Sequence, residues 1–578
     1  MSRASGRMSP GRWAWSLVRL DVTGVVFAAV FFCLSLTPSL LPRDWVTAGI
    51  IGGINAAIGY GVGVLIAALT RRVLLRRRRW WPLARRVRLG VQGCAIAVSI
   101  AASMSMLVPA AAWQRDVAEL MGVDGPSTAG YLRSLPVAVL TACLLIAAAR
   151  VVKDAIKGIS RLLIRRWNVD DEVAMFIGTA VVVILIVTVV NGVLLRGLLS
   201  AASAVFQPQN AATRADVTQP EAPQRSGSPA SFAPWDTLGF QGRNFVATGP
   251  GADELAVING RPAKEPIRIY AGLQSGADAG ERVAVLLSEL QRTRAYERKM
   301  LVIIPTTGTG WVDPVAARAI ESMYNGDTVL VAMQYSYLPS WISFLADRDK
   351  SVQAGRAMVD AVANRWQQWP ADTRPKLALY GESLGAMAGQ GAFGYLPDVA
   401  RMGFSSVLWV GPPNESRLWN ALTVRRDPGA PEVAPRYDNG RTVRFAQSSS
   451  PGEIAAVAAP AWTEPKVLFL QHASDPVVWW SPDLLFAKPD WLREPPGFDR
   501  SASMRWYPIV TFWQVSADMA GNVTNAAGVP PGHGHEYGDR QLDGWVAVAA
   551  PDGWTQFDTD RIRRSLEKAM TGRGPEFE

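Results

Sequence analysis

The stretch of sequence that decides the fold of the C-terminal part of the chain is Lys376-Leu377-Ala378-Leu379-Tyr380-Gly381-Glu382-Ser383-Leu384-Gly385. Residues 376–380 form a short apolar run typical of a buried strand, and the Ala- and Gly-rich residues after Gly385 favour a helix packed closely on a sheet. A serine on a sharp strand-to-helix turn needs neighbours two residues away that are nearly free of side chain, and Gly381 and Gly385 meet this need. The stretch therefore predicts a strand, a tight turn and a helix, with Ser383 as a nucleophile.

The elements around this stretch follow the order of an α/β domain. Short apolar runs bounded by turn residues alternate with helical patterns, which favours a mainly parallel sheet with flanking helices. We predict strands at 267–271, 300–304, 328–334, 376–380, 406–410, 466–470 and 509–515.

A serine nucleophile on such a sheet requires an acid and then a histidine, each placed after a later strand. Asp475 follows the strand at 466–470 and occupies the place expected for the acid. The alternative is that Asp475 only caps a turn before Pro476, in which case Asp483 is the next candidate acid.

Only three histidines are present, so the general base is easy to locate. His472 precedes the acid and is expected to pack or hydrogen-bond locally. The small residue before His535 and the helix expected after Tyr537 favour His535 as the base, while His533 stays open as the alternative. A His-x-His pair with a carboxylate also resembles a zinc or iron ligand set, but that scheme leaves the serine turn without a role, and we predict no metal.

Two backbone segments are predicted to stabilise an oxyanion. The Leu384 amide lies at the start of the helix after the nucleophile. A second donor is expected from Thr307, Gly308 and Thr309, because glycines let an amide point into a site, although this loop could also be a simple tight turn. The loop lacks the Lys and Ser/Thr ending of a nucleotide-binding loop, so no cofactor is predicted.

Charge and cysteine content exclude several other classes of function. The formal net charge of +10 arises largely from arginines beside long apolar runs, and no basic patch with interleaved aromatics marks a nucleic-acid surface. All three cysteines lie inside apolar stretches, so the polar half has neither a disulfide framework nor a thiolate zinc site.

Five apolar segments are predicted to cross a membrane, at 22–41, 46–70, 89–112, 135–149 and 173–195. Basic residues cluster before the first segment and at 71–88 and 150–166, and basic loops stay cytoplasmic. The N-terminus is therefore expected in the cytoplasm and the residues after Leu195 outside it. We predict a multi-span domain at 1–202, a flexible linker at 203–234 and an α/β-hydrolase domain at 235–578 with cap insertions near 412–465 and 478–507.

Several of these motifs resemble one family. They are Thr307-Gly308-Thr309-Gly310-Trp311-Val312-Asp313-Pro314, Gln334-Tyr335-Ser336-Tyr337-Leu338-Pro339-Ser340-Trp341, Gly381-Glu382-Ser383-Leu384-Gly385, His472-Ala473-Ser474-Asp475-Pro476 and Gly532-His533-Gly534-His535. In these residues the chain is similar to the bacterial, largely actinobacterial, membrane-anchored serine hydrolases of alpha/beta-hydrolase family nine, which have their own N-terminal membrane domain. The resemblance implies the fold and the role of Ser383 more than any substrate.

The sequence leaves three functions open. The first is hydrolysis of an acyl or lipid-like ester, which a membrane anchor and the aromatic residues of 478–507 favour, although such rings are more often core. The second is acyl transfer to an envelope lipid or glycan by the same residues. The third is a non-enzymatic membrane scaffold or binding module; the apolar segments contain few acidic groups of the kind that mark an ion path.

Overall fold

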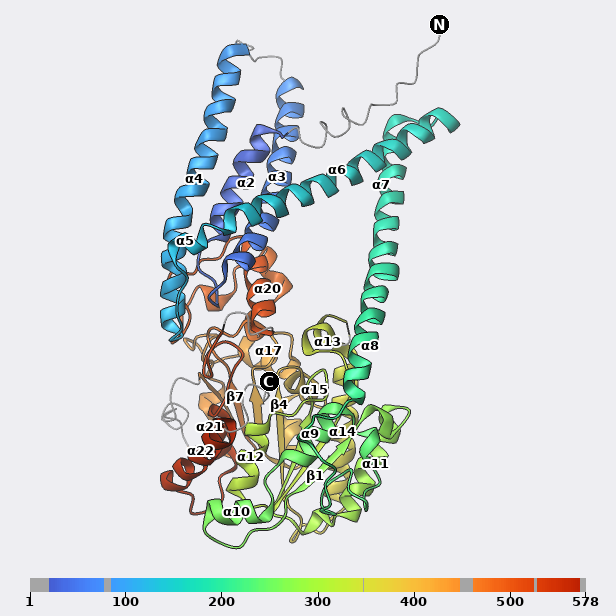
Figure 1. Cartoon of the computed structure of the whole chain (residues 1–578), viewed down its shortest axis with the longest axis vertical. Helices are drawn as coiled ribbons and strands as arrows, with labels where there is room; N and C mark the ends of the chain where they lie inside the picture. The colour runs from blue at the N-terminus through green and yellow to red at the C-terminus, as the bar shows by residue number, and fades with distance from the viewer. Residues whose placement is uncertain (1–19, 77–84, 347, 448–460, 524–527, 572–578) are drawn as a thin grey trace. The chain divides into compact units, whose positions relative to one another are not determined.

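A computed structural model describes residues 20–76, 85–346, 348–447, 461–523 and 528–571 (Figure 1). The chain divides into two compact units. The helical unit comprises Met1–Ser200, Asp483–Lys488 and Ser503–Ala527, and the sheet unit comprises Ala201–Pro482, Pro489–Ala502 and Gly528–Glu578. Two segments that lie far along the sequence therefore belong to the N-terminal helical unit.

The sheet unit is built on one seven-stranded sheet with the order β1-β3-β2-β4-β5-β7-β6. All neighbouring strands are parallel, with Met300 beside Thr328 on one side and Lys376 on the other. The strands are β1 Ile267–Ala271, β2 Met300–Pro305, β3 Thr328–Met333, β4 Lys376–Glu382, β5 Phe404–Val410, β6 Val443–Ala446 and β7 Lys466–Leu470. The predicted parallel sheet is thus confirmed.

Helices cover both faces of this sheet, which explains why its strands are continuous apolar runs (Figure 1). One face packs against α9 Gly239–Thr248, α12 Pro314–Met323 and α21 Arg540–Ala549, and α22 Gln556–Thr571 packs on α12 and α21. The other packs against α11 Ala279–Arg292, α14 Arg348–Gln367 and α15 Leu384–Gln390. Further α-helices among the described residues of the sheet unit include α10 Ala252–Asn259, α13 Ser340–Ala346, α16 Leu396–Arg401, α17 Arg417–Val424 and α19 Pro476–Trp479.

One predicted strand was wrong, and one strand of the sheet was missed. The run at 509–515 lies in helix α20, Val510–Val523, because a short apolar run fits a buried helix as well as a strand. The edge strand β6 was missed inside the predicted cap at 412–465, because four residues carry too weak an alternation to be recognised. Part of that insertion therefore extends the sheet; residues 448–460 lie outside the described part of the chain.

The predicted flexible linker at 203–234 is also different in the structure. Helix α8, Leu195–Ala211, runs through its first part. Further along, the Ser226 amide donates to the Arg268 carbonyl of β1 at 2.9 Å, and the Ser226 hydroxyl lies 3.0 Å from Glu289. This segment is therefore hydrogen-bonded to the sheet unit and is not a free linker. Amino-acid composition alone cannot predict such hydrogen bonds.

The helical unit contains four helices long and apolar enough to cross a membrane among the described residues: Trp45–Val73, Arg86–Leu120, Thr128–Trp167 and Asp171–Thr188. They lie in α3 Trp45–Arg76, α4 Arg85–Leu120, α5 Thr128–Tyr131 with α6 Ser134–Trp167, and α7 Asp171–Thr188, which continues through the π-helix η1 Val189–Leu194 into α8. Among the described residues, four of the five predicted spans thus correspond to helices long enough to cross a membrane. The first, α2 Val22–Ser35, has 14 residues and ends before Pro38, which cannot continue a helix.

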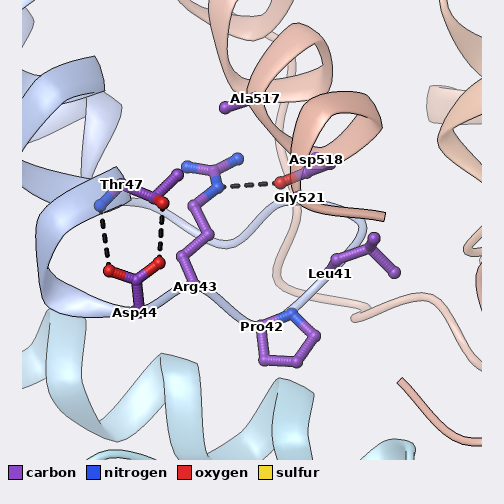
Figure 2. A pocket seen from close by; sticks show the side chains of 8 residues that line it. All are labelled: Leu41, Pro42, Arg43, Asp44, Thr47, Ala517, Asp518 and Gly521. Atoms are coloured by element: carbon purple, nitrogen blue, oxygen red, sulfur yellow. Dashed lines mark hydrogen bonds and ion pairs between the residues drawn. The ribbon is translucent and has the colours of Figure 1, made fainter. Parts of the chain in front are cut away.

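Helix α20 packs in the helical unit through a buried ion pair (Figure 2). The Arg43 Nε atom, from the loop between α2 and α3, lies 2.8 Å from Asp518 Oδ1, and both side chains are at most 4% exposed. The Ser39 hydroxyl and the Leu40 amide donate to the other carboxylate oxygen. The cavity beside this pair measures about 10 Å³, room for about one water molecule and too small for a substrate.

Candidate active site

Ser383 lies on a strained turn between β4 and α15. Its φ and ψ angles are 53° and −123°, a region that residues with a side chain avoid, at a cost of about 1–3 kcal/mol. The glycines permit the turn: a Cβ on Gly381 would lie 2.7 Å from the Gly385 carbonyl oxygen, and one on Gly385 would lie 2.3 Å from the Pro305 oxygen. The Ser383 amide donates to the Val410 carbonyl at the end of β5. The serine is thus half-buried at the carboxyl edge of the sheet.

Asp475 and His535 are paired at the same edge. The Nδ1 atom of His535 lies 2.7 Å from Oδ2 of the fully buried Asp475. The Tyr537 hydroxyl donates to the same oxygen at 2.7 Å, and the Val477 amide donates to the other oxygen at 2.8 Å. Burial lowers the pKa of the His535 imidazole, but the charge and hydrogen bond of Asp475 outweigh it, so the net shift is upward.

The His535 ring lies against Gly411, directly after β5. A Cβ on Gly411 would be 2.6 Å from Cε1 and 2.8 Å from Nδ1 of His535, and Gly411 has a φ of +49°. The Ser383 amide binds the carbonyl of the preceding residue, Val410, so the ring and the serine backbone lie at two consecutive residues at the end of β5. The structure therefore pairs His535 with Asp475 and places the His535 ring one residue along the chain from the carbonyl that binds the Ser383 amide. Gly411 was missed in the sequence, where a glycine after a strand is too common to stand out.

His533 has a different partner from His535. Its Nδ1 atom lies 3.3 Å from Oδ2 of Asp499, a buried acid that the sequence did not single out. The metal-ligand alternative needs the two histidines and a carboxylate to converge. Among the residues described by the structure, no group of three or more His, Cys, Asp or Glu side chains is arranged to hold a metal ion. The alternative acid Asp483 lies in a 3₁₀ helix, Pro482–Leu485, of the helical unit.

The loop predicted to supply the second oxyanion donor reaches the serine turn at Thr306. A Cβ on Gly385 would lie 3.4 Å from the Thr306 carbonyl carbon. The amides of Thr307 and Gly308 donate to the Trp311 carbonyl and the Ser340 hydroxyl, both at 3.3 Å, and the Thr309 carbonyl accepts from Gln334. Thr306 is thus nearer the turn than the residues expected, while Leu384 begins α15 as predicted.

A buried acid also lies beside the nucleophile. Burial, together with the charges of Asp313 and Glu536, raises the pKa of Glu382 well above 4.5. The Tyr380 hydroxyl lies 2.9 Å from Glu382 Oε2 and also contacts Gln541 Oε1. A phenol has one hydrogen to donate, so it can donate to only one of these two oxygens. Burial likewise raises the pKa of Asp313 to about 7.

The aromatic residues of the predicted cap at 478–507 are only partly core: Trp479, Trp480 and Trp491 are buried, whereas Phe486 is 77% exposed. Trp479 and Trp491 are at most 1% exposed and pack against each other with ring centroids 5.6 Å apart. Trp419 adds an edge contact to Trp479 at 6.1 Å. Trp480 is also buried and contacts Phe344. The three buried tryptophans of this segment thus serve packing, as is common for tryptophan.

Comparison with known families agrees with this architecture. A sequence profile described as the alpha/beta-hydrolase family matches residues 267–562, from β1 into α22. A second profile, described as the N-terminus of the alpha/beta-hydrolase family, matches residues 36–250. No curated protein and no solved structure matches the chain. Because the first profile covers more than half of the chain and the second covers most of the remainder, the protein belongs to alpha/beta-hydrolase family nine and has that family's own N-terminal domain.

Proposed function

We propose that the protein is a membrane-anchored serine hydrolase that cleaves an acyl or lipid-like ester through Ser383, His535 and Asp475. The observation that carries the proposal is the 2.7 Å contact between His535 and Asp475, with the histidine ring packed on Gly411 beside the residue that binds the Ser383 amide. A strained serine, an imidazole and a buried carboxylate at one sheet edge are the parts that acyl transfer through serine requires.

In the proposed reaction, Ser383 attacks the ester carbonyl while His535 takes the hydroxyl proton. Asp475 accepts a hydrogen bond from Nδ1, which leaves Nε2 as the basic nitrogen and stabilises the imidazolium that forms. The upward shift of the His535 pKa makes it a stronger base. The Leu384 amide and an amide of the loop that begins at Thr306 are the proposed oxyanion donors. The imidazolium then returns the proton to the leaving alcohol, and water releases the acyl group.

The apolar helices support a membrane-resident substrate and suggest an orientation. The basic ends at 71–88 and 150–166 favour a cytoplasmic location for the end of α3 and the end of α6. Helix α7 then runs outward whether or not the shorter α2 crosses the membrane. We therefore keep the proposal that the sheet unit lies outside the cytoplasm, where an envelope lipid or acyl ester would be its substrate.

A fluorophosphonate probe applied to membranes that contain the protein tests the nucleophile. We expect covalent labelling of the wild type, loss of labelling in Ser383→Ala, and wild-type labelling in the control Ser288→Ala, which changes an exposed serine of α11. Labelling of Ser383→Ala at the wild-type rate would overturn the proposal. With an ester substrate and an added alcohol, the ratio of free acid to new ester distinguishes hydrolysis from acyl transfer, the alternative that uses the same residues.

A further inference from the structure

Gly534, between His533 and His535, is held through both of its backbone groups. Its amide donates to the Ser474 hydroxyl at 2.8 Å. Its carbonyl oxygen lies 2.8 Å from Nδ1 of His472. His472 and Ser474 precede Asp475 on the loop after β7, and both are fully buried. The loop that contains the proposed acid is therefore hydrogen-bonded to the loop that contains the proposed base.

The contact with Gly534 defines the state of His472. A carbonyl oxygen can only accept, so Nδ1 carries the hydrogen and Nε2 of a neutral ring is bare. Nε2 is buried and has no hydrogen-bond partner within the described parts of the chain. The ring stacks on Tyr537, with centroids 4.1 Å apart and planes 17° apart. Burial lowers the pKa of His472, which agrees with a neutral ring that acts as a fixed donor.

Ser474 has an equally defined role as an acceptor. Its hydroxyl donates to Asp499 Oδ2, and its amide donates to Asp499 Oδ1 at 3.0 Å. Because Asp499 takes the only hydroxyl hydrogen, the oxygen lone pairs are directed to the Gly534 amide. The same Asp499 oxygen lies 3.3 Å from His533. Asp499 thus orients Ser474 and holds the loop on the other side of Gly534.

We propose that His472 and Ser474 are positioning residues that clamp Gly534 and so hold His535 against Asp475. This inference rests on the proposed function. Gly534 has a φ of +56° and, as a glycine, has more backbone freedom to lose than other residues. The peptide before Gly534 is held through its N–H and the peptide after Gly534 through its C=O, so little rotation is left about the Gly534 Cα. The next residue, His535, then keeps its Nδ1 atom 2.7 Å from the carboxylate.

Two substitutions at one position separate a positioning role from simple packing. In His472→Asn the side-chain amide nitrogen can occupy the place of Nδ1, whereas in His472→Gln it falls near the place of Nε2. We expect His472→Gln to lower the rate constant of fluorophosphonate labelling by about tenfold to hundredfold, the range typical of groups that orient a reactive side chain. His472→Asn should retain most of the rate. Ser474→Ala should lower the labelling rate constant about as much as His472→Gln. In the double variant the rate constant should fall by less than the product of the two single fold-losses.

The pH profile of the labelling rate gives a readout that loss of folded protein does not change. A looser contact with Asp475 lowers the apparent pKa of His535 toward its ordinary value, whereas partial unfolding lowers only the labelled amount. Equal losses of labelling rate in His472→Asn and His472→Gln would overturn the proposal. An apparent pKa of His535 that stays unchanged in both His472→Gln and Ser474→Ala would also overturn it. If Ser383→Ala is still labelled, the proposed function itself fails, which is a different result.

Discussion

The His535 imidazole and Gly411 are in such close contact that an added methyl group at Gly411 would lie 2.6 Å from the ring. Van der Waals contact between carbon atoms is about 3.5–4.0 Å, so the histidine position depends on the absence of a side chain there. The end of β5 thus binds the serine amide through Val410 and receives the histidine at the next residue.

Gly411→Ala is expected to displace His535 and to lower the labelling rate of Ser383 by more than tenfold. Gly429→Ala is a matched control, because Gly429 also has a positive φ, +82°, but an added Cβ there meets no atom within 4 Å. Both changes should cost about 1–2 kcal/mol in backbone strain. Gly411→Ala should lose further stability through its clash with the His535 ring, and labelling should fall only in this variant. Equal labelling of the two folded variants would contradict the packing argument.

Asp475→Asn is expected to lower ester hydrolysis by roughly 10³- to 10⁴-fold, because an amide favours the wrong histidine tautomer. It should also move the acidic limb of the pH–rate profile to lower pH, since the Asp475 charge raises the pKa of His535. Asp483→Asn, which changes the alternative acid, should leave rate and profile at wild-type values. A larger loss in Asp483→Asn would instead identify Asp483 as the acid.

Comparison of the two histidine variants identifies the base. His535→Ala should lower ester hydrolysis by about 10⁴-fold or more, because proton removal from Ser383 is lost. His533→Ala should lower it by about tenfold or less, because His533 binds Asp499 rather than Asp475. Steady-state hydrolysis of a short-chain ester measures both, and the reverse order would assign the base to His533.

Glu382→Gln should make stability less dependent on pH. The folded state raises the Glu382 pKa well above 4.5, so the contribution of this group is most favourable below that pH and declines as the pH rises toward the folded pKa. The uncharged amide avoids this loss. The gain in Tm of Glu382→Gln over the wild type should therefore grow between pH 5 and pH 8, as measured by thermal unfolding in detergent. Glu567→Gln, at an exposed position of α22, should show no such trend.

The ion pair between Arg43 and Asp518 should stabilise the helical unit. Asp518→Ala leaves a buried arginine without its carboxylate and is expected to cost about 3–5 kcal/mol. Replacing both residues, as in Arg43→Met with Asp518→Leu, should recover much of this loss. Glu297→Ala breaks an exposed pair with Arg294 and should cost under about 1 kcal/mol. A similar Tm for Asp518→Ala and Glu297→Ala would contradict the role of the buried pair.

Much of the architecture was predictable because local patterns encode it. Six of the seven strands are apolar runs bounded by turn residues, and the spacing of Gly381 and Gly385 is enough to indicate the serine turn. The candidate acid and histidines followed from their order after Ser383. Contacts such as Asp499 with Ser474 or Glu382 with Tyr380 could not be predicted, because no local sequence pattern distinguishes a buried acid from an exposed one.

The sequence by itself determined the family, the parallel sheet, the serine turn and the long apolar helices, because these depend on residue spacing and on runs of apolar side chains. Only the tertiary structure decided that residues 510–523 form a helix of the helical unit, that β6 joins the sheet, and that His535 rather than His533 meets Asp475. Arg43 and Asp518 lie 475 residues apart, and His535 lies 60 residues from Asp475. Pairings at such separations arise from packing of the whole chain, which brings together side chains that no local pattern relates.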